Sequence, residues 1–233
     1  LKGLSQKITK LKDRLSSLTS SYNKLADELS RARIIASKKL SNQIEKMMNQ
    51  LNMEGAIFKV EIKQNSDHNS PIICGEDNVK YGPKGYDIVE FYLSANPGES
   101  IKPLAKIASG GEVSRIMLSI KSVLKEQDPV ATLIFDEIDA GISGEAAEKV
   151  AKALKSLSVN KQVVCITHLP QIASIADNHL FVGKKVVENK TYVHTQYLND
   201  KEKVEAVAKL FSGEGNIDQG INSKENFISR ARG

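Results

Sequence analysis

Two acidic residues follow a short apolar segment in the sequence TLIFDE, where Asp136 and Glu137 come directly after Phe135. A short continuous apolar run is typical of a buried strand in a parallel sheet, and open α/β sheets bind ligands at the carboxyl ends of their strands. Adjacent carboxylates there suit two tasks: holding Mg²⁺ and polarising an attacking water. The alternative is a strand that simply ends in two solvated acids.

Two further stretches could contribute to the same site. The sequence SGGE (109–112) opens a helical pattern, and free backbone N–H groups at a helix start beside a serine hydroxyl can bind an anion. His168 directly follows a second apolar run, KQVVCIT (161–167). If the two runs are parallel neighbours, His168 lies near the acidic pair and can sense a terminal phosphate. A helix cap and a structural histidine are the alternatives.

The elements that must position these residues alternate between strand and helix. Helical periodicity covers residues 112–124 and 144–157, and the apolar runs 130–135 and 161–167 follow them. This order predicts an α/β sheet. The segments 56–63 and 86–93 and a hairpin near 180–198 read as antiparallel edge strands. Asp139, Gly141 and Ser143 fall in the turn after the acids.

The first fifty residues carry a heptad repeat. Its apolar positions are Leu4, Ile8, Leu11, Leu15, Leu18, Tyr22, Leu25, Leu29, Ala32 and Ala36, followed after a stutter by Leu40, Ile44, Met47 and Leu51. The spacing predicts one helix of roughly 70 Å, at about 1.5 Å per residue. Its narrow apolar seam needs a second helix, which this chain does not contain. A long helix packed on its own domain is the alternative.

The charge distribution and composition of the chain indicate which classes of binding partner it could have. Residues 1–52 hold eleven Lys and Arg against four Asp and Glu, whereas the rest holds 22 against 24. Nucleic acid could bind such a basic arm, although solvated lysines are the commoner explanation. No long apolar run predicts a membrane span. The two cysteines form no CxxC pair and are expected as buried thiols in a reducing cytoplasm. The missing initiator Met indicates an excised piece.

A phosphate-binding loop is absent from the sequence. Such a loop needs Gly, four residues, Gly, Lys and then Ser or Thr. The one Gly-Lys step, Gly183-Lys184, is followed by Lys185, and Asn178 stands where the first Gly is required. A site assembled on Asp136 and Glu137 would therefore need a loop from elsewhere.

The ordered set SGGE, LIFDE, DAG and ITHLP resembles the second half of an ABC-type ATPase head. The preceding coiled coil resembles the SMC-like subset, and the stretches VEFYLSANPGESIKPLAKIASGGEVSRIMLSIK and CITHLPQIA resemble the RecN family of bacterial DNA repair proteins. The resemblance covers about residues 1–212. Each motif alone is weak, whereas their order is highly specific.

The resemblance implies a role for each matching residue. Asp136 would support Mg²⁺, Glu137 would be the catalytic base and His168 the switch histidine at the γ-phosphate. Asp139 would belong to a loop that communicates between two heads. The signature residues, which would touch ATP held by the opposite protomer, are Ser109, Gly110, Gly111 and Glu112.

The fold expected from the resemblance is the C-terminal lobe of an ABC/SMC-type P-loop ATPase head with antiparallel edge strands, preceded by a long coiled-coil helix. The expected domains are the coiled coil (1–52), the ATPase lobe (53–212) and a polar tail (213–233). ATP and Mg²⁺ are the implied cofactors. The implied partners are the N-terminal half of the same protein, with its Walker A lobe and ascending helix, a second head and DNA.

The implied function is repair of DNA double-strand breaks by a cytoplasmic, nucleoid-associated ATPase whose isolated C-terminal half is inactive. The alternative from another class is a non-enzymatic DNA-binding or oligomerisation module that keeps the head fold. The heptad arm argues against a transporter subunit, which uses the same motifs without such an arm.

Overall fold

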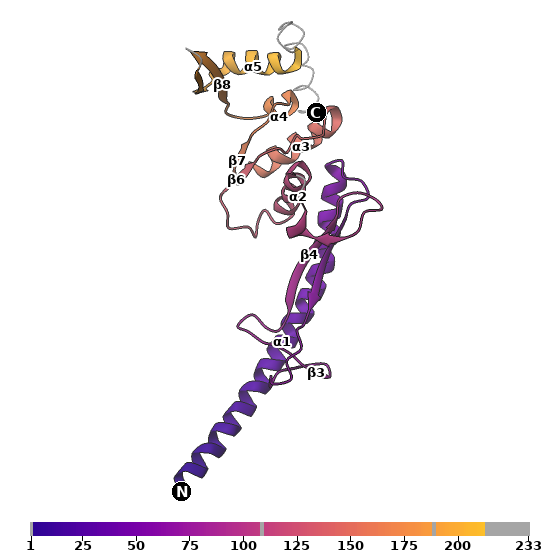
Figure 1. Ribbon diagram of the computed structural model, residues 1–233, viewed down its shortest axis with the longest axis vertical. Helices are drawn as coiled ribbons and strands as arrows, with labels where there is room; N and C mark the ends of the chain where they lie inside the picture. Colours follow the sequence, from indigo (N-terminus) through magenta and orange to yellow (C-terminus); the bar gives the residue numbers. More distant parts are fainter. Residues whose placement is uncertain (1, 108–109, 188–189, 213–233) are drawn as a thin grey trace. The chain divides into compact units, whose positions relative to one another are not determined.

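The computed structural model describes residues 2–107, 110–187 and 190–212 (Figure 1). The chain divides into two compact units, formed by Leu1–Lys46 with Gly55–Ile107 and by Met47–Glu54 with Ala108–Gly233. Ser109 and the predicted tail 213–233 lie outside the described residues. The domains predicted from the sequence, 1–52, 53–212 and 213–233, are not tested by this structural division and stay a prediction.

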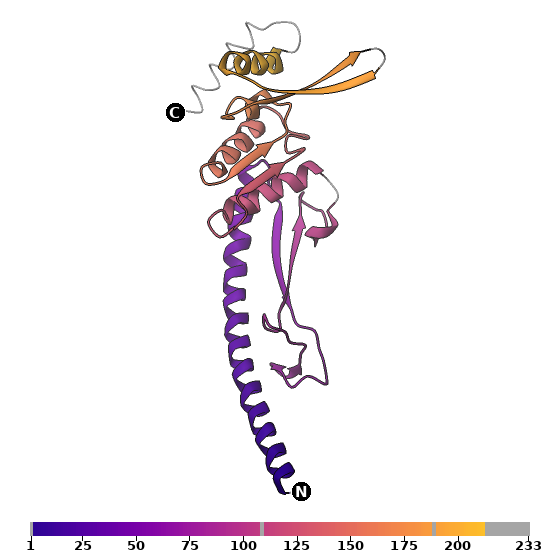
Figure 2. The ribbon, with the colours of Figure 1, turned by 90° about the vertical axis from the view of Figure 1, so that its left-hand side faces the viewer.

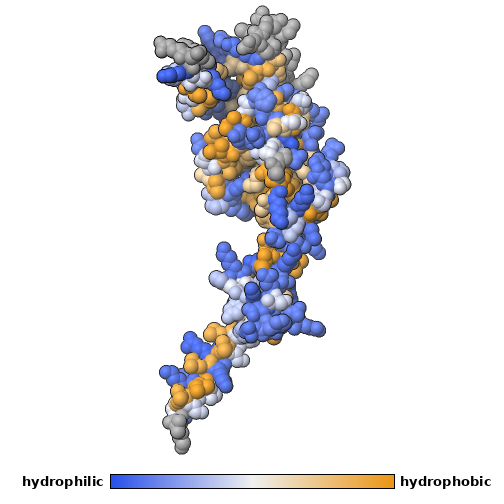
Figure 3. Space-filling view, in the orientation of Figure 1, coloured by the Kyte–Doolittle hydropathy of each residue, from blue (hydrophilic) through white to orange (hydrophobic). Residues whose placement is uncertain are grey.

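Helix α1 (Lys2–Gln50) confirms the long helix that the heptad spacing predicts. The seam residues of its first half are exposed, with Leu11 and Leu18 each 59% accessible. Figure 3 shows apolar side chains on this part of the helix. The exposed large apolar residues of this seam are Leu4, Ile8, Leu11, Leu15, Leu18, Leu25 and Leu29. An apolar stripe left open along a single helix is typical of a helix that pairs with another.

Another part of α1, which includes the seam residue Tyr22, packs against a loop region that contains the short strands β2 (Ile73–Cys74) and β3 (Asp77–Asn78). Ala26 forms a buried cluster with Ile72, Val79 and Tyr86 from this region. The hydroxyl of Tyr22 donates to the carbonyl of Gly82 at 2.9 Å. The loop region is thus fastened to the helix by its own core.

Asp87 is the main polar anchor of that packing. Its side chain is only 1% exposed and pairs with Arg33 at 3.0 Å. Ser30 Oγ and Gln64 Nε2 also donate to its carboxylate, at 3.0 and 2.8 Å. Because three donors surround one buried carboxylate, its charge is compensated where water is excluded.

The first unit also holds an antiparallel sheet in the order β1–β4–β5, from Ile57–Lys63, Ile88–Ser94 and Lys102–Pro103, followed by a short 3₁₀ turn, η1 (Leu104–Lys106). Strands β1 and β4 run beside α1 in Figures 1 and 2. Phe58 N–H donates to the carboxylate of Glu45 at 3.0 Å, and neighbouring Ile44 is fully buried. The seam is therefore covered by this chain itself near its end, where the sequence predicted an outside partner.

Helix α1 ends through a left-handed residue. Asn52 has φ 62°, its N–H donates to Asn49 O, and Met53 N–H donates to Met48 O. This pair of bonds is the Schellman arrangement, in which Asn can replace the usual Gly. The turn places Leu51 in the core of the second unit.

The second unit begins with α2 (Gly110–Val123), β6 (Thr132–Phe135), α3 (Gly144–Leu157), β7 (Gln162–Cys165) and the short α4 (Pro170–Ala173). Strands β6 and β7 are parallel, with Phe135 opposite Cys165, which confirms the predicted pairing. Side chains of alternating positions, including Leu133 and Phe135, enter a core shared with α2 and α3.

The opposite face of the β6–β7 pair departs from the sequence prediction. Both strands read as buried on two faces, yet Ile134 is 70% exposed and Val164 and Ile166 are also exposed. Parallel sheets are normally covered on both faces. This pair has one apolar face without a cover among the described residues.

The remaining elements are a hairpin of β8 (Leu180–Val187) with β9 (Lys190–Tyr197), visible as a long ribbon in Figure 2, and helix α5 (Asp200–Ser212). The predicted antiparallel hairpin is confirmed, and among the described residues it forms a two-stranded sheet of its own. Every residue of β9 is exposed. Among the helices of the described residues, none has both the length and the apolar character that crossing a membrane requires.

Candidate functional site

The acidic pair lies directly after β6, in a turn held by helix α2. Ser114 Oγ donates to the backbone carbonyl of Asp136 at 2.7 Å, and the Asp136 carboxylate accepts the N–H of Glu137 at 2.9 Å. Glu137 has φ 55°, a left-handed conformation that is uncommon for a residue with a side chain. Such conformations cost on the order of 1–3 kcal/mol and occur preferentially at functional sites.

The amino end of α2 packs against this turn, because its two glycines leave room. A Cβ atom at Gly110 would overlap Oε2 of Glu137, so the carboxylate lies against the glycine. A Cβ at Gly111 would come within 2.8 Å of the Cβ of Ala140 and within 3.2 Å of the Glu137 carbonyl oxygen. Gly111 is thus required by close packing against Ala140 and backbone atoms, whereas Gly110 leaves room for the Glu137 side chain in its present position. Glu112 follows them, half-buried, in the first turn.

Asp139 faces the interior and binds the residues after β7. It is 5% exposed, and its Oδ2 accepts the Thr167 hydroxyl and the His168 N–H, the latter at 2.9 Å. The Nδ1 atom of His168 lies 3.1 Å from the same oxygen, while the His168 side chain is 75% exposed. Since a carboxylate only accepts, this contact favours the neutral tautomer with its proton on Nδ1, which leaves Nε2 as the acceptor nitrogen.

One buried cation of the site was missed in the sequence. Arg115 on α2 is 8% exposed, and its Nη1 donates to the carbonyls of Ile138 and Ala140, at 3.4 and 2.8 Å. Burial lowers the pKa of Arg115, and nearby Glu112 opposes this effect. In the sequence, Arg115 lies next to the apolar stripe of α2. That position does not distinguish a buried arginine from a solvated one.

The structure thus gathers the described residues of the predicted site around one turn. Asp136, Glu137 and Asp139 form the turn, Gly110 and Gly111 pack on it, and His168 binds to it. Ser109 lies outside the described residues. The side-chain oxygen of Gln171, three residues after His168, is buried without a hydrogen-bond partner among the described residues.

The donor set fits Mg²⁺ with a phosphate ligand. No cluster of three or more His, Cys, Asp or Glu side chains suited to a metal occurs in the described part of the chain. Mg²⁺ does not need one, because it is commonly held by one or two carboxylates together with substrate phosphates and water. Asp136 offers an exposed carboxylate, and the glycine-opened start of α2 lies against the next residue, Glu137.

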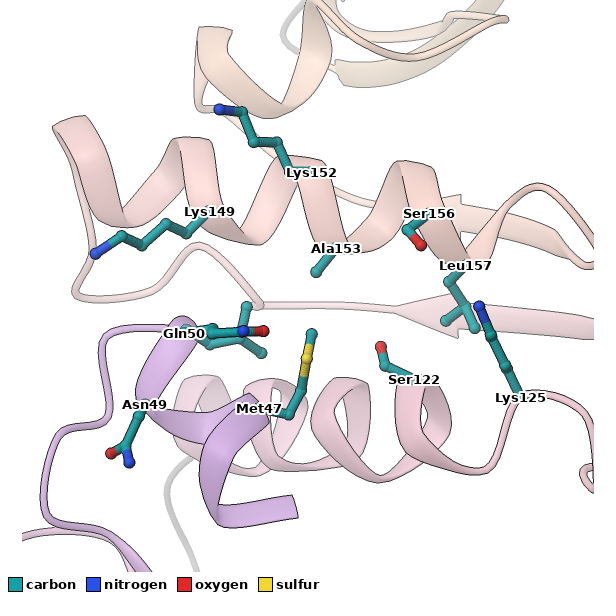
Figure 4. Close-up of a pocket in the computed structure, with 11 residues that line it drawn as sticks. Met47, Asn49, Gln50, Ser122, Lys125, Lys149, Lys152, Ala153, Ser156 and Leu157 are labelled. Carbon is teal, nitrogen blue, oxygen red and sulfur yellow. The ribbon is translucent and has the colours of Figure 1, made fainter. Parts of the chain in front are cut away.

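A cavity of about 690 Å³ lies elsewhere in the second unit, between the last turn of α1, α2 and α3 (Figure 4). Met47, Leu51 and Leu157 contribute apolar walls, and Lys125 and Lys152 also line it. Ser122 and Lys125 place it toward the carboxyl end of α2, whereas the acidic turn packs on the amino end. The cavity is therefore separate from the predicted chemistry.

Comparison with known proteins agrees with the geometry. The chain matches no protein-family model. It is 42% identical over 174 residues to the DNA repair protein RecN of Halalkalibacterium halodurans, covering 75% of this chain and 29% of that protein. It is 36% identical over 225 residues to the DNA repair protein RecN of Vibrio cholerae, covering 96% of this chain and 38% of that protein. The chain thus spans about a third of the length of these curated relatives.

Among solved structures, the chain is similar to the Smc head domain with a coiled coil and joint from Pyrococcus yayanosii, with a TM-score of 0.56 and 18% identity. The match covers 90% of this chain and 36% of that one. At this identity the likeness shows the fold. The predicted fold, the C-terminal lobe of an SMC-type head with a long preceding helix, is confirmed.

Proposed function

The chain belongs to the RecN family, and we propose that it supplies the signature, Walker B and switch-histidine residues of a composite ATP-hydrolysing head that acts in DNA repair. The observation that carries this proposal is the single turn after β6. That turn brings two carboxylates, a glycine-opened helix start and an exposed histidine into one place.

Each residue has a chemical task in this proposal. Asp136 holds Mg²⁺, which neutralises phosphate charge when it is bound with ATP. Glu137 orients a water and accepts its proton. His168 presents its outward ring nitrogen to the terminal phosphate. Asp139 belongs to the loop between two heads and, through its bonds to Thr167 and His168, orients the histidine.

The signature residues act on a second head in this proposal. Ser109, Gly110, Gly111 and Glu112 contact ATP that the opposite protomer holds. A helix start can bind an anion through its free N–H groups. ATP then joins two heads, and hydrolysis separates them.

Two observations support a missing lobe as the partner. The phosphate-binding sequence is absent from the 233 residues. The apolar face of β6–β7 is open at Ile134, Val164 and Ile166, where a parallel sheet is ordinarily covered. We propose that the other part of a RecN-type protein supplies the phosphate loop, covers this face and pairs a helix with the open seam of α1.

The test is ATP turnover by the chain, alone and mixed with a polypeptide that carries the phosphate-loop lobe. We expect turnover only in the mixture, and a loss of about 10²–10⁴-fold for Glu137→Gln, the range of a general base. Glu126→Gln, which changes an exposed acid outside the site, is the matched control. Robust turnover by the chain alone, or full turnover of Glu137→Gln in the mixture, would contradict the proposal.

A non-enzymatic DNA-binding module is the second candidate, favoured by the basic charge of residues 1–52. Lys7, Lys10 and Lys12 are exposed along the first turns of α1. Binding through such lysines weakens steeply with salt because counterions are released from DNA. Salt-dependent DNA binding without nucleotide, together with no turnover in a mixture that demonstrably associates, would favour this reading.

A further inference from the structure

We propose that Arg115 is a positioning residue that holds the turn after β6 and thereby, through Asp139, fixes the orientation of His168. The proposal concerns a residue outside the predicted site. Its part in catalysis rests on the proposed function, whereas its part in orienting the histidine can be measured without nucleotide.

Side chains of α2 hold the turn after β6 through hydrogen bonds. Residues 136–140 have three backbone carbonyls that accept bonds from α2 side chains. Ser114 binds the first, at Asp136, and the guanidinium of Arg115 binds those of Ile138 and Ala140. The carbonyl of Ile138 is buried and needs such a partner, because an unsatisfied polar group inside a protein is costly.

The second step is the place of Asp139. In sequence it lies between the two residues whose carbonyls Arg115 binds, and its side chain contacts the segment after β7. Its Oδ2 accepts from Thr167 and from the His168 backbone, and it also contacts Nδ1 of the His168 ring. A shift of the turn therefore moves the oxygen that holds the histidine at two atoms.

The third step is the choice of arginine. Each terminal nitrogen of a guanidinium carries two N–H donors in a fixed plane, so the single Nη1 of Arg115 can reach two carbonyls of the same turn. The remaining Nε of Arg115 is buried without a hydrogen-bond partner among the described residues. A charged group is thus kept in the interior although one of its donors is unused. We attribute this to the grip on the two carbonyls.

These contacts connect the signature glycines at the start of α2 with His168. Gly110 and Gly111 open the same helix that carries Arg115, one turn away. A ligand that moves the amino end of α2 would shift the turn and, with it, His168. In the proposed head this connects the signature, which faces one ATP, to the histidine, which faces the other.

The test uses the full chain labelled with ¹⁵N-histidine. The chain has four histidines, and the His168 signals are assigned by their loss in His168→Gln. Ring ¹⁵N shifts report which nitrogen carries the proton. We expect the Nδ1–H form in the unaltered chain, and a shift toward mixed tautomers in both Asp139→Asn and Arg115→Met. Arg115→Lys, which keeps a donor, should lie between Arg115→Met and the unaltered chain.

The matched control is Lys121→Met, which removes a partly buried cation from the same helix, where it pairs with Asp128. It should leave the His168 signals unchanged. Unchanged His168 signals in folded Arg115→Met would overturn the proposal, as would equal changes in Lys121→Met. Should Arg115→Met fail to fold, Arg115→Lys decides, because a His168 shift toward that of Asp139→Asn supports the proposal and no shift overturns it.

Turnover in the assembled head gives a second readout. We expect Arg115→Met to lower kcat by about ten- to hundredfold, the scale of small misplacements, with KM for ATP nearly unchanged. Absence of turnover in the unaltered assembly would count against the proposed function, while the histidine signals would still decide the role of Arg115.

Discussion

The Oε2 atom of Glu137 occupies the space that a side chain at Gly110 would fill. The carboxylate lies at the amino end of α2, where the helix dipole favours negative charge. The glycine that opens the helix and the glutamate that ends the strand therefore fit only as a pair. Any side chain at position 110 must move the glutamate.

Gly110→Ala should accordingly separate stability from activity. The atom it meets is the far end of an exposed, flexible side chain, so we expect little loss of stability and a large loss of turnover in the assembled head. Gly111→Ala instead meets Ala140 and backbone atoms. We expect it to destabilise the chain by about 1–3 kcal/mol, as overpacking does.

The control for both variants is Gly82→Ala, since a Cβ at that position meets nothing closer than 3.9 Å. Denaturant unfolding and ATP turnover are measured for all three. A Gly110→Ala variant that retains full turnover would show that the position of the Glu137 carboxylate is unimportant.

Asp87→Ala should destabilise the first unit. Its buried carboxylate holds Ser30, Arg33 and Gln64, and removal leaves their donors unpaired. Because Arg33 is partly exposed and can be rehydrated, we expect a loss of about 2–3 kcal/mol. Urea unfolding of Asp87→Ala is compared with Asp77→Ala, whose side chain is exposed. Equal stability of the two variants would show that the Asp87 carboxylate does not stabilise the first unit.

The Lys121–Asp128 pair should give a pH-dependent contribution to stability. The pair is 2.7 Å apart, and the hydrogen bond from Lys121, with one from the Val130 N–H, lowers the pKa of Asp128. The stabilisation is then fully present above the ordinary value of about 4 and is lost as pH falls through the lowered pKa. Asp128→Asn should lower Tm at pH 7, with a difference that shrinks in acid.

The measurement is thermal unfolding of the unaltered chain, Asp128→Asn and Asp77→Asn across a pH series. A Tm difference for Asp128→Asn that stays constant down to the acid limit would mean that the ionised carboxylate is not the source of the stabilisation.

Cys165 should resist alkylation. Burial, helped by the nearby Asp139 and Asp136 charges, raises the pKa of its thiol to about 12. Because the thiolate is the reacting form, iodoacetamide at pH 8 should modify Cys165 far more slowly in the folded chain than after unfolding. Peptide mass spectrometry measures both rates, and similar rates would contradict the burial of this thiol.

The open seam of α1 should be needed for pairing and not for folding. Leu11 and Leu18 are exposed, so replacing both with Lys should leave the helical circular dichroism unchanged. Association with the complementing helix should be lost, because charge enters an apolar seam. Ser20→Lys, at another exposed position, is the control. Undiminished association of the double variant would exclude this seam as the contact.

The sequence by itself determined the elements whose signal is local. The heptad spacing predicted α1, alternation predicted β1 and β4, and the apolar runs before Asp136 and His168 predicted β6 and β7 as neighbours. These patterns are readable because backbone geometry repeats with a fixed period along one segment.

The tertiary structure alone decided which long-range contacts use those elements. Nothing local distinguishes Ser30 and Arg33 from other solvated residues of α1, yet both bind Asp87, more than fifty residues away. Arg115 likewise is buried and hydrogen-bonded only because the turn after β6 packs against it. Burial and hydrogen bonding of polar side chains depend on which distant segments meet, and no periodicity along the chain records that choice.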